Sequence, residues 1–96
     1  MKPCEHEMEA RLRRFFNLLG RCVFARRKAL NKTQEQVAED SGLSRSEVQF
    51  AENGGRHMSV ATLLRLCRGL GEIYPAELLM EQMRRDRDER RARRAP

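Results

Sequence analysis

The sequence predicts an all-α fold of five helices around one small core. Apolar residues recur at intervals of three and four along most of the chain, which is the spacing of a buried helix face. Aromatic and β-branched residues are sparse, and no stretch alternates apolar and polar residues, so we expect no strands. A chain of 96 residues has room for one domain with a modest core and for no second domain.

The first helical segment reaches as far as Asn31, which offers a left-handed stop. One apolar stripe with steps of three, four and seven residues predicts either one long helix or two consecutive ones. Asn17 or Gly20 could divide the segment into two. The stripe consists of Met8, Leu12, Phe15, Leu19, Val23 and Leu30.

Two short helices with a tight turn between them come next. Thr33 and Gln36 form a capping box, in which the threonine hydroxyl accepts from the N–H three residues on and the glutamine reaches back. Ser44 and Glu47 form a second box eleven residues later, with Gly42 between the two boxes. Two short helices joined by a glycine-containing turn and flanked by packing helices form a helix-turn-helix arrangement.

Two further helices complete the predicted fold. The second short helix should stop at residues 53–55, where Asn, Gly and Gly follow one another. Ser59 begins a fourth helix, which Gly69 and Gly71 close, and Pro75 suits the first turn of a fifth. The fifth helix leads into an arginine-rich end with acidic residues four positions before arginines. Two interpretations of this end stay open: a solvated helix terminus, or a tail that binds phosphates or a partner.

Charge is unevenly distributed along the chain. The 20 Lys and Arg outnumber the 14 Asp and Glu, which gives a net charge of +6 and a pI near 10. Residues 1–33 hold nine basic and three acidic side chains, residues 34–80 four and seven, and residues 81–96 seven and four. The basic flanks favour a polyanionic partner, either nucleic acid or an anionic membrane surface. Nucleic acid is preferred, because the apolar stripe is needed for the core.

Several classes of protein are disfavoured. No apolar run approaches the ~20 residues that span a bilayer, and the N-terminus lacks a signal-peptide core, so we expect a cytoplasmic protein that engages no membrane. Cys22 and Cys67 lie among apolar residues and are interpreted as small buried side chains. Cys4 and His6 are too few ligands for a zinc site. Because the sequence holds neither a phosphate loop nor a convincing nucleophile, we expect no enzyme, no catalytic residues, no metal and no cofactor.

Residues 19–79 resemble the Cro-like repressor family, the XRE-type helix-turn-helix regulators. The chain reads RKALNKTQEQVA at residues 27–38 and SGLSRSEVQFAENG at residues 41–54, and both strings are similar to the family pattern. A Pro-Ala-Glu-Leu-Leu run from Pro75 completes the match. The resemblance implies a five-helix, lambda-repressor-like DNA-binding domain at residues 18–80. A helical extension would precede it at residues 1–17, and a basic helix end or tail would follow at residues 81–96.

The resemblance makes the helix after Ser44, residues 44–53, the recognition helix, which enters the major groove of double-stranded DNA. An arginine can hold guanine and a glutamine adenine through two hydrogen bonds each. For the phenylalanine, a thymine-methyl contact and a packing role at the rim of the core both stay open. The side chains predicted to read bases lie on the face opposite Val48 and Ala51; they are Arg45, Ser46, Gln49 and Phe50.

The resemblance also implies contacts to DNA phosphates at both sides of the recognition helix. Arg27 is interpreted either as a packing or ion-pairing residue or as a further phosphate contact. This division explains the low positive charge of residues 41–54, with one Arg and two Glu, because bases are distinguished by hydrogen bonds rather than by bulk charge. The predicted phosphate contacts are Gln34, Ser44, Asn53, Gly54 and Arg56.

Two hypotheses about function follow. The first is a sequence-specific transcriptional regulator, a repressor or autoregulator that binds a palindromic operator as a homodimer. The second is an antitoxin or other interaction protein that binds a protein partner as well as DNA, which the apolar residues of the extension favour.

Two surfaces compete as the dimer interface. One is the extension, through Met8, Leu12, Phe15 and Phe16. The other is the fifth helix, which the resemblance favours because related repressors pair through their last helices. Its interface would consist of Ile73, Tyr74, Leu79, Met80 and Met83.

Overall fold

The computed structural model describes residues 3–94, and all regular structure in this range is helical. The predicted all-α fold with five helices is confirmed. The helices are α1 (Pro3–Ala29), α2 (Gln34–Ser41), α3 (Arg45–Glu52), α4 (Val60–Gly69) and α5 (Pro75–Arg94).

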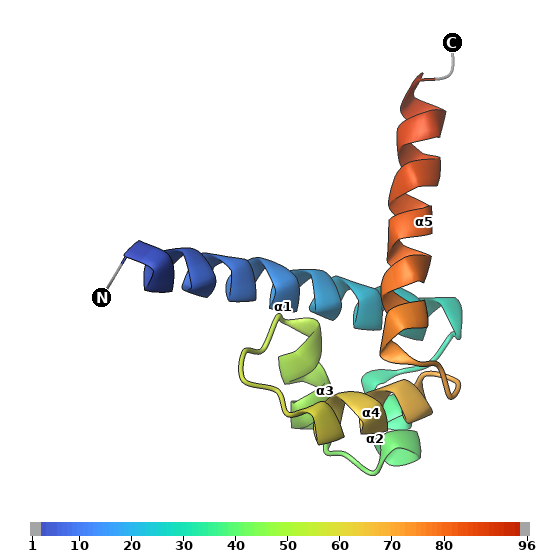
Figure 1. Ribbon diagram of the computed structural model, residues 1–96. Helices are drawn as coiled ribbons and strands as arrows, with labels where there is room; N and C mark the ends of the chain where they lie inside the picture. Colours follow the sequence, from blue (N-terminus) through green and yellow to red (C-terminus); the bar gives the residue numbers. More distant parts are fainter. Residues whose placement is uncertain (1–2, 95–96) are drawn as a thin grey trace.

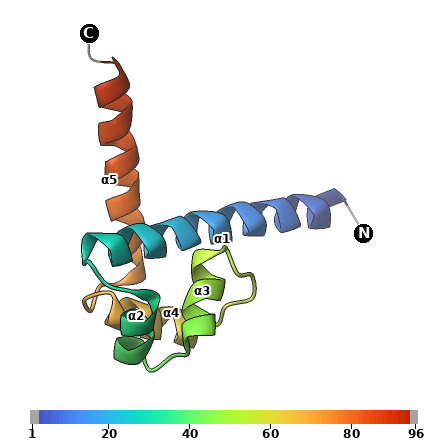
Figure 2. The same ribbon diagram turned by 180° about the vertical axis from the view of Figure 1, so that it is seen from behind.

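Three short helices form a compact body beneath the longest helix. Helix α1 packs on α3 and on α5, while α2 packs on α3 and α4. The N-terminal half of α1 and the C-terminal half of α5 project away from this body in different directions (Figures 1 and 2). The molecule is therefore flat, with extents of 48 × 38 × 19 Å, and has two protruding helical ends.

Local sequence sets the boundaries of the short helices. The Thr33 hydroxyl accepts from the Gln36 N–H at 3.1 Å, and the Gln36 side chain accepts from the Thr33 N–H at 2.8 Å. Ser44 and Glu47 repeat this arrangement at the start of α3, at 3.1 and 3.0 Å. Gly42, with φ of 70°, ends α2 in the left-handed conformation that glycine adopts without strain. Both predicted capping boxes are thus present.

Helix α1 is continuous, and neither Asn17 nor Gly20 divides it. A side chain at Gly20 would not fit, since an added Cβ would lie 2.6 Å from the Glu52 carbonyl oxygen and 2.8 Å from that of Ala51. Glycine therefore allows α1 to approach the end of the α3 backbone closely. After α1 the chain turns at Asn31, whose φ of 58° makes it the predicted left-handed residue.

The core lies between the C-terminal half of α1, the three short helices and the start of α5. Cys22 and Cys67 are fully buried in it, as predicted. Burial raises the pKa of the Cys67 thiol to about 11 and also raises the pKa of Cys22, so both remain protonated and pack as small apolar side chains. The buried apolar residues are Leu19, Cys22, Val23, Val37, Ala38, Val48, Ala51, Leu66, Cys67, Leu70, Ile73 and Leu78.

The apolar stripe of α1 is buried over only part of its length. On α1 itself, Leu19 and Val23 are buried against the core, whereas Met8, Leu12 and Phe15 remain exposed. The difference arises because the N-terminal half of the helix extends beyond the body of the protein (Figure 1). The exposed part of the stripe therefore leaves apolar surface accessible to solvent.

Helix α5 continues to Arg94, so the arginine-rich end is helical. Two of the predicted pairs four residues apart are present, with Glu81–Arg85 at 3.5 Å and Glu89–Arg93 at 3.9 Å. Within residues 3–94, no helix has the length and apolar content needed to cross a membrane.

Candidate nucleic-acid interface

Helix α3 presents one apolar and one polar face. Val48 and Ala51 are buried against the core. The opposite face is exposed and carries the four residues predicted to contact bases, Arg45, Ser46, Gln49 and Phe50. The helix is therefore oriented so that these side chains are accessible together.

A buried ion pair holds the end of α3 against α1. The Arg27 guanidinium donates to both carboxylate oxygens of Glu52, at 2.6 and 2.9 Å, and to the Lys32 carbonyl at 2.9 Å. The Arg27 and Glu52 side chains are only 8% and 4% exposed. The hydrogen bonds to Glu52 raise the pKa of Arg27 above its ordinary value. Of the two roles left open for Arg27, the structure shows ion pairing.

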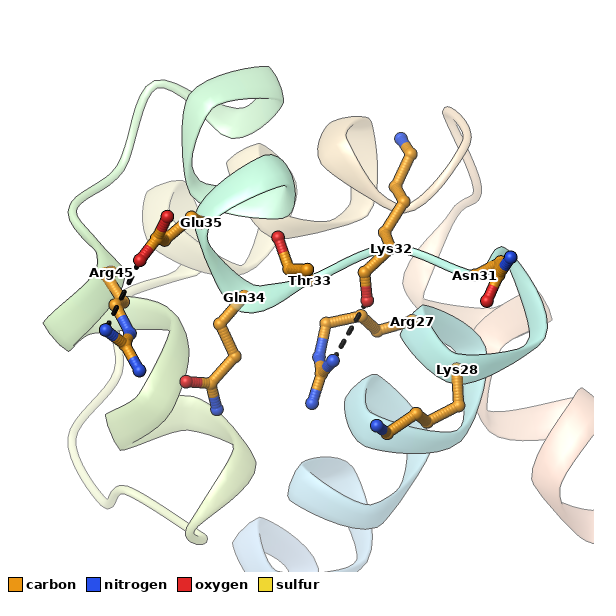
Figure 3. A pocket seen from close by; sticks show the side chains of 8 residues that line it. All are labelled: Arg27, Lys28, Asn31, Lys32, Thr33, Gln34, Glu35 and Arg45. Atoms are coloured by element: carbon orange, nitrogen blue, oxygen red, sulfur yellow. Dashed lines mark hydrogen bonds and ion pairs between the residues drawn. The ribbon is translucent and has the colours of Figure 1, made fainter.

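A cationic hollow of about 490 Å³ opens beside the start of α2. In Figure 3 the Gln34 side chain extends into it, between Arg45 on one side and Lys28 on the other. The Lys32 side chain points away and donates to Asp40 at 2.9 Å and to the Gly69 carbonyl at 3.1 Å. The hollow is lined by Arg27, Lys28, Asn31, Lys32, Thr33, Gln34, Glu35 and Arg45.

This hollow has the chemistry of a phosphate site. It combines cationic side chains with the N-terminus of α2, where backbone N–H groups and the helix dipole favour an anion. Gln34, the predicted phosphate contact, donates from Nε2 to Glu52 at 3.2 Å. Glu52 therefore both pairs with Arg27 and orients the Gln34 amide.

Arg45 is held only loosely. Its Nη1 lies 3.3 Å from the Glu35 carboxylate on α2, and the two side chains are 63% and 73% exposed. Exposed pairs of this kind contribute about 0–1 kcal/mol. A base edge or phosphate can therefore displace Glu35 at little cost.

The loop after α3 carries the second set of predicted phosphate contacts. The N–H of Gly54 donates to the Ala51 carbonyl at 3.1 Å, so this amide is already used within the loop. Arg56 pairs with Glu9 of α1 at 3.0 Å. Asn53 is exposed at the end of α3. The side chains of Asn53 and Arg56 are therefore the groups of this loop best suited to hold an anion.

Ser44 and Phe50 also have contacts inside the protein. The Ser44 hydroxyl accepts from Glu47 in the capping box, which positions the first turn of α3. The Phe50 ring lies directly against Gly55, where an added Cβ would overlap the ring carbons. Because Phe50 is still 53% exposed, it packs on the loop and keeps much of the ring accessible to a base.

The predicted dimer residues divide into three groups. Tyr74, Met80 and Met83 are exposed, and Leu79 is half-buried against the core. Ile73 belongs to the protomer's own core and has little surface left for a second chain, because it packs where α4 meets α5. The exposed group is therefore the part of this set that can form an interface.

Two residues of this region were not predicted as site residues from the sequence. Lys28 lines the cationic hollow, and its place in the RKALNKTQEQVA string beside Arg27 is the signal that could have identified it. Glu9 pairs with Arg56, which lies 47 residues further along the chain, and no local pattern connects the two. For metals, no group of three or more His, Cys, Asp or Glu side chains suited to an ion exists within residues 3–94.

Comparison with known proteins identifies the family. A profile described as helix-turn-helix matches residues 23–78, more than half of the chain. The chain belongs to the XRE-type helix-turn-helix family. None of the curated proteins searched matches this chain.

Two solved structures are similar to this member of the family. The restriction-modification controller protein C.AhdI from Aeromonas hydrophila is 36% identical with a TM-score of 0.61, and the match covers 66% of this chain and 94% of that one. A single-residue mutant of the restriction-modification controller protein C.Esp1396I has the same fold, with 22% identity and a TM-score of 0.62, over 71% of this chain and 89% of that one.

The family membership indicates the general function of the protein. This helix-turn-helix protein is a DNA-binding transcriptional regulator. The predicted helix-turn-helix corresponds to α2 and α3, within the matched residues.

Proposed function

We propose that this protein is a repressor or autoregulator that binds a palindromic operator as a homodimer in the cytoplasm. The observation that carries the proposal is the exposed polar face of α3, with Arg45, Ser46 and Gln49 accessible together. One α3 helix contacts one half-site, and the two-fold symmetry of the dimer matches that of the operator. The two recognition helices would lie about 34 Å apart, one turn of DNA.

The similarity to C.AhdI supports a narrower proposal. That protein is a restriction-modification controller, and 94% of its chain aligns with this one at 36% identity. We infer that the present protein controls genes of the same kind of system, its own gene included.

Helix α5 is the proposed dimer surface. Met80 and Met83 are exposed on it and Tyr74 is exposed directly before it, and grouped exposed apolar side chains mark interaction sites. The competing surface is the N-terminal half of α1, with Met8, Leu12 and Phe15 exposed.

Footprinting on the DNA upstream of the protein's own gene tests operator binding. We expect two protected segments related by a two-fold axis and centred about one helical turn apart. A single protected segment without symmetry would contradict the palindromic operator, and a complete lack of protection would contradict autoregulation.

Light scattering on two matched double variants tests the dimer surface. Met80→Glu with Met83→Glu should give a folded monomer with much weaker operator binding, because charge is placed in the apolar interface. Met8→Glu with Leu12→Glu is the control and should remain dimeric. A dimer in the first variant and a monomer in the second would move the interface to α1.

A second candidate function is favoured by the exposed apolar stripe of α1. Under this proposal Met8, Leu12 and Phe15 bind a different protein, so that the chain acts as an antitoxin or similar interaction protein as well as a DNA binder. Co-expression with the product of the neighbouring gene tests it: a stable complex that Leu12→Glu disrupts would support this function. Independent purification of the two proteins would exclude that partner.

A further inference from the structure

Two residues of the N-terminal extension, Glu9 and Asn17, contact the loop that follows the recognition helix. Glu9 pairs with Arg56 at 3.0 Å, and the Asn17 side chain lies against Gly54, where an added Cβ would overlap it. Both α1 residues precede the segment that the family profile matches, residues 23–78. The extension is thus built into the predicted phosphate-binding region, although the family pattern does not include it.

Arg13 occupies the position between these two contacts. It stands four residues after Glu9 and four before Asn17, and residues four apart lie on the same face of a helix. Arg13 is exposed, and no salt bridge to it is present among the described residues. Arg13 therefore lies on the face of α1 that borders the loop at residues 53–56.

The backbone amides of the two loop glycines are not free to hold an anion. The backbone N–H groups of Gly54 and Gly55 donate to the carbonyls of Ala51 and Phe50, at 3.1 and 2.8 Å, so neither is available to a ligand. Beside them lies a shallow hollow of about 520 Å³, lined by Phe50, Asn53, Gly54, Gly55, Arg56 and His57. An anion entering this hollow therefore meets the Arg56 side chain and cannot use the Gly54 or Gly55 amide.

We propose that Arg13 and Arg56 together form a second phosphate-binding site for the DNA backbone, with Glu9 as an internal counter-ion that the phosphate replaces. The inference rests on the proposed operator binding and extends it to the helical extension. Arg13, Arg56 and Glu9 together carry two positive charges and one negative charge, so these three side chains have a net positive charge that suits one phosphodiester group. The Glu9–Arg56 pair is about 40% exposed, 41% and 42% for the two side chains, and exposed pairs exchange partners at low cost.

The experiment compares three variants of the full chain for operator affinity across a salt series. Arg13→Gln should weaken binding to all sequences and lower the slope of log K against log salt by about one unit, as expected for one lost phosphate contact. Arg11→Gln is the matched control, because it removes the same charge from the same extension at about 200° around the helix. Its slope should stay that of the parent protein.

Glu9→Gln tests the counter-ion. It should tighten operator binding several-fold at low salt by freeing Arg56, and the gain should disappear when Arg56→Ala is also present. Equal effects of Arg13→Gln and Arg11→Gln would overturn the inference, since they would show diffuse attraction instead of a site. An unchanged affinity in Glu9→Gln would also contradict it.

Two further variants separate this inference from the proposed function. If Arg45→Ala and Arg56→Ala weaken binding while Arg13→Gln behaves like Arg11→Gln, the operator interface stands and only the Arg13 site is wrong. If none of these variants alters DNA binding, both the interface and the inference are wrong. Thermal unfolding of each variant establishes that the protein is folded.

Discussion

Two arginine–glutamate pairs flank the recognition helix, and they differ in burial. Arg27 and Glu52 share two hydrogen bonds of 2.6 and 2.9 Å, and their side chains are almost completely buried. Arg45 and Glu35 are joined by one contact of 3.3 Å, and both side chains lie mostly in solvent. Each pair connects two helices, so the residue types and the connection are alike. Exposure is what separates them.

Burial decides whether such a pair is a structural part or a replaceable contact. Removing one partner of a buried pair leaves a charge that water cannot reach, whereas an exposed side chain is simply rehydrated. The proposed DNA-binding surface thus combines a buried inner pair, which holds α3 against α1, with outer pairs whose arginines can change partner.

The largest effect is expected from Glu52→Ala. The substitution leaves the buried Arg27 unpaired and also removes the partner of Gln34, so the free energy of unfolding should fall by about 3–5 kcal/mol. Urea denaturation of the variant measures this. Glu35→Ala is the matched control at the exposed pair and should change stability by no more than about 0.5 kcal/mol. Similar losses in the two variants would contradict the distinction between the pairs.

Arg45→Ala should act on recognition and leave folding unchanged. The variant should lose about 1–3 kcal/mol of discrimination between operator and random DNA while keeping weak, non-specific association. Competition between an operator duplex and a random duplex measures the ratio. If that ratio equals the parent value, Arg45 does not read a base.

Gln34→Ala should affect the binding of DNA in general and not the choice of base. Gln34 contacts Glu52 and also lines the cationic hollow. Binding to all sequences should weaken by about 1 kcal/mol, the value of one hydrogen bond, with base preference unchanged. Gln36→Ala on the same helix is the control. It should reduce stability, since Gln36 closes a capping box, and leave the affinity of the folded protein unaltered. A changed base preference in Gln34→Ala would refute a phosphate role.

The smallest effect concerns pH and the second capping box. The N–H and then the hydroxyl of Ser44 hold the pKa of Glu47 below its ordinary value. A carboxylate with a lowered pKa stabilises the fold above the unfolded-state pKa of about 4.3, and this contribution is lost as the pH falls through the folded-state value. Urea unfolding measures the free energy of unfolding of the parent and of Glu47→Gln from about pH 6 to about pH 3. The difference between the two proteins should become smaller as the pH falls. A difference in stability that does not change with pH would contradict a contribution from the ionised Glu47 carboxylate.

Helix boundaries could be predicted because their causes are local. Thr33 and Ser44 are each satisfied three residues away, and Asn31 and Gly42 turn the chain through their own backbone conformation. The buried and exposed faces of α3 followed from the spacing of Val48 and Ala51 for the same reason. Local chemistry of this kind is fully present in a short stretch of sequence.

The continuity of α1 at Gly20 and the burial of its apolar face could not be predicted from the sequence of this helix alone. Gly20 is a poor helix former and suggested a break, yet its purpose is the close approach of the Ala51 and Glu52 carbonyls. The apolar stripe predicted a helix over its full length. It could not show that the stripe is exposed from Met8 to Phe15 and buried from Leu19 onward. What a helix face packs against depends on where the rest of the chain lies.

The sequence by itself determined the helices, their caps, the helix-turn-helix and the residues exposed on α3, since each depends on neighbours within about one turn of helix. Only the tertiary structure decided which charges pair. Glu52 lies 25 residues from Arg27, and Glu9 lies 47 residues from Arg56, so the fold alone brings these side chains together. The same packing decides that Arg27 is buried and Arg45 exposed, and the cost of separating an ion pair depends on the surrounding solvent.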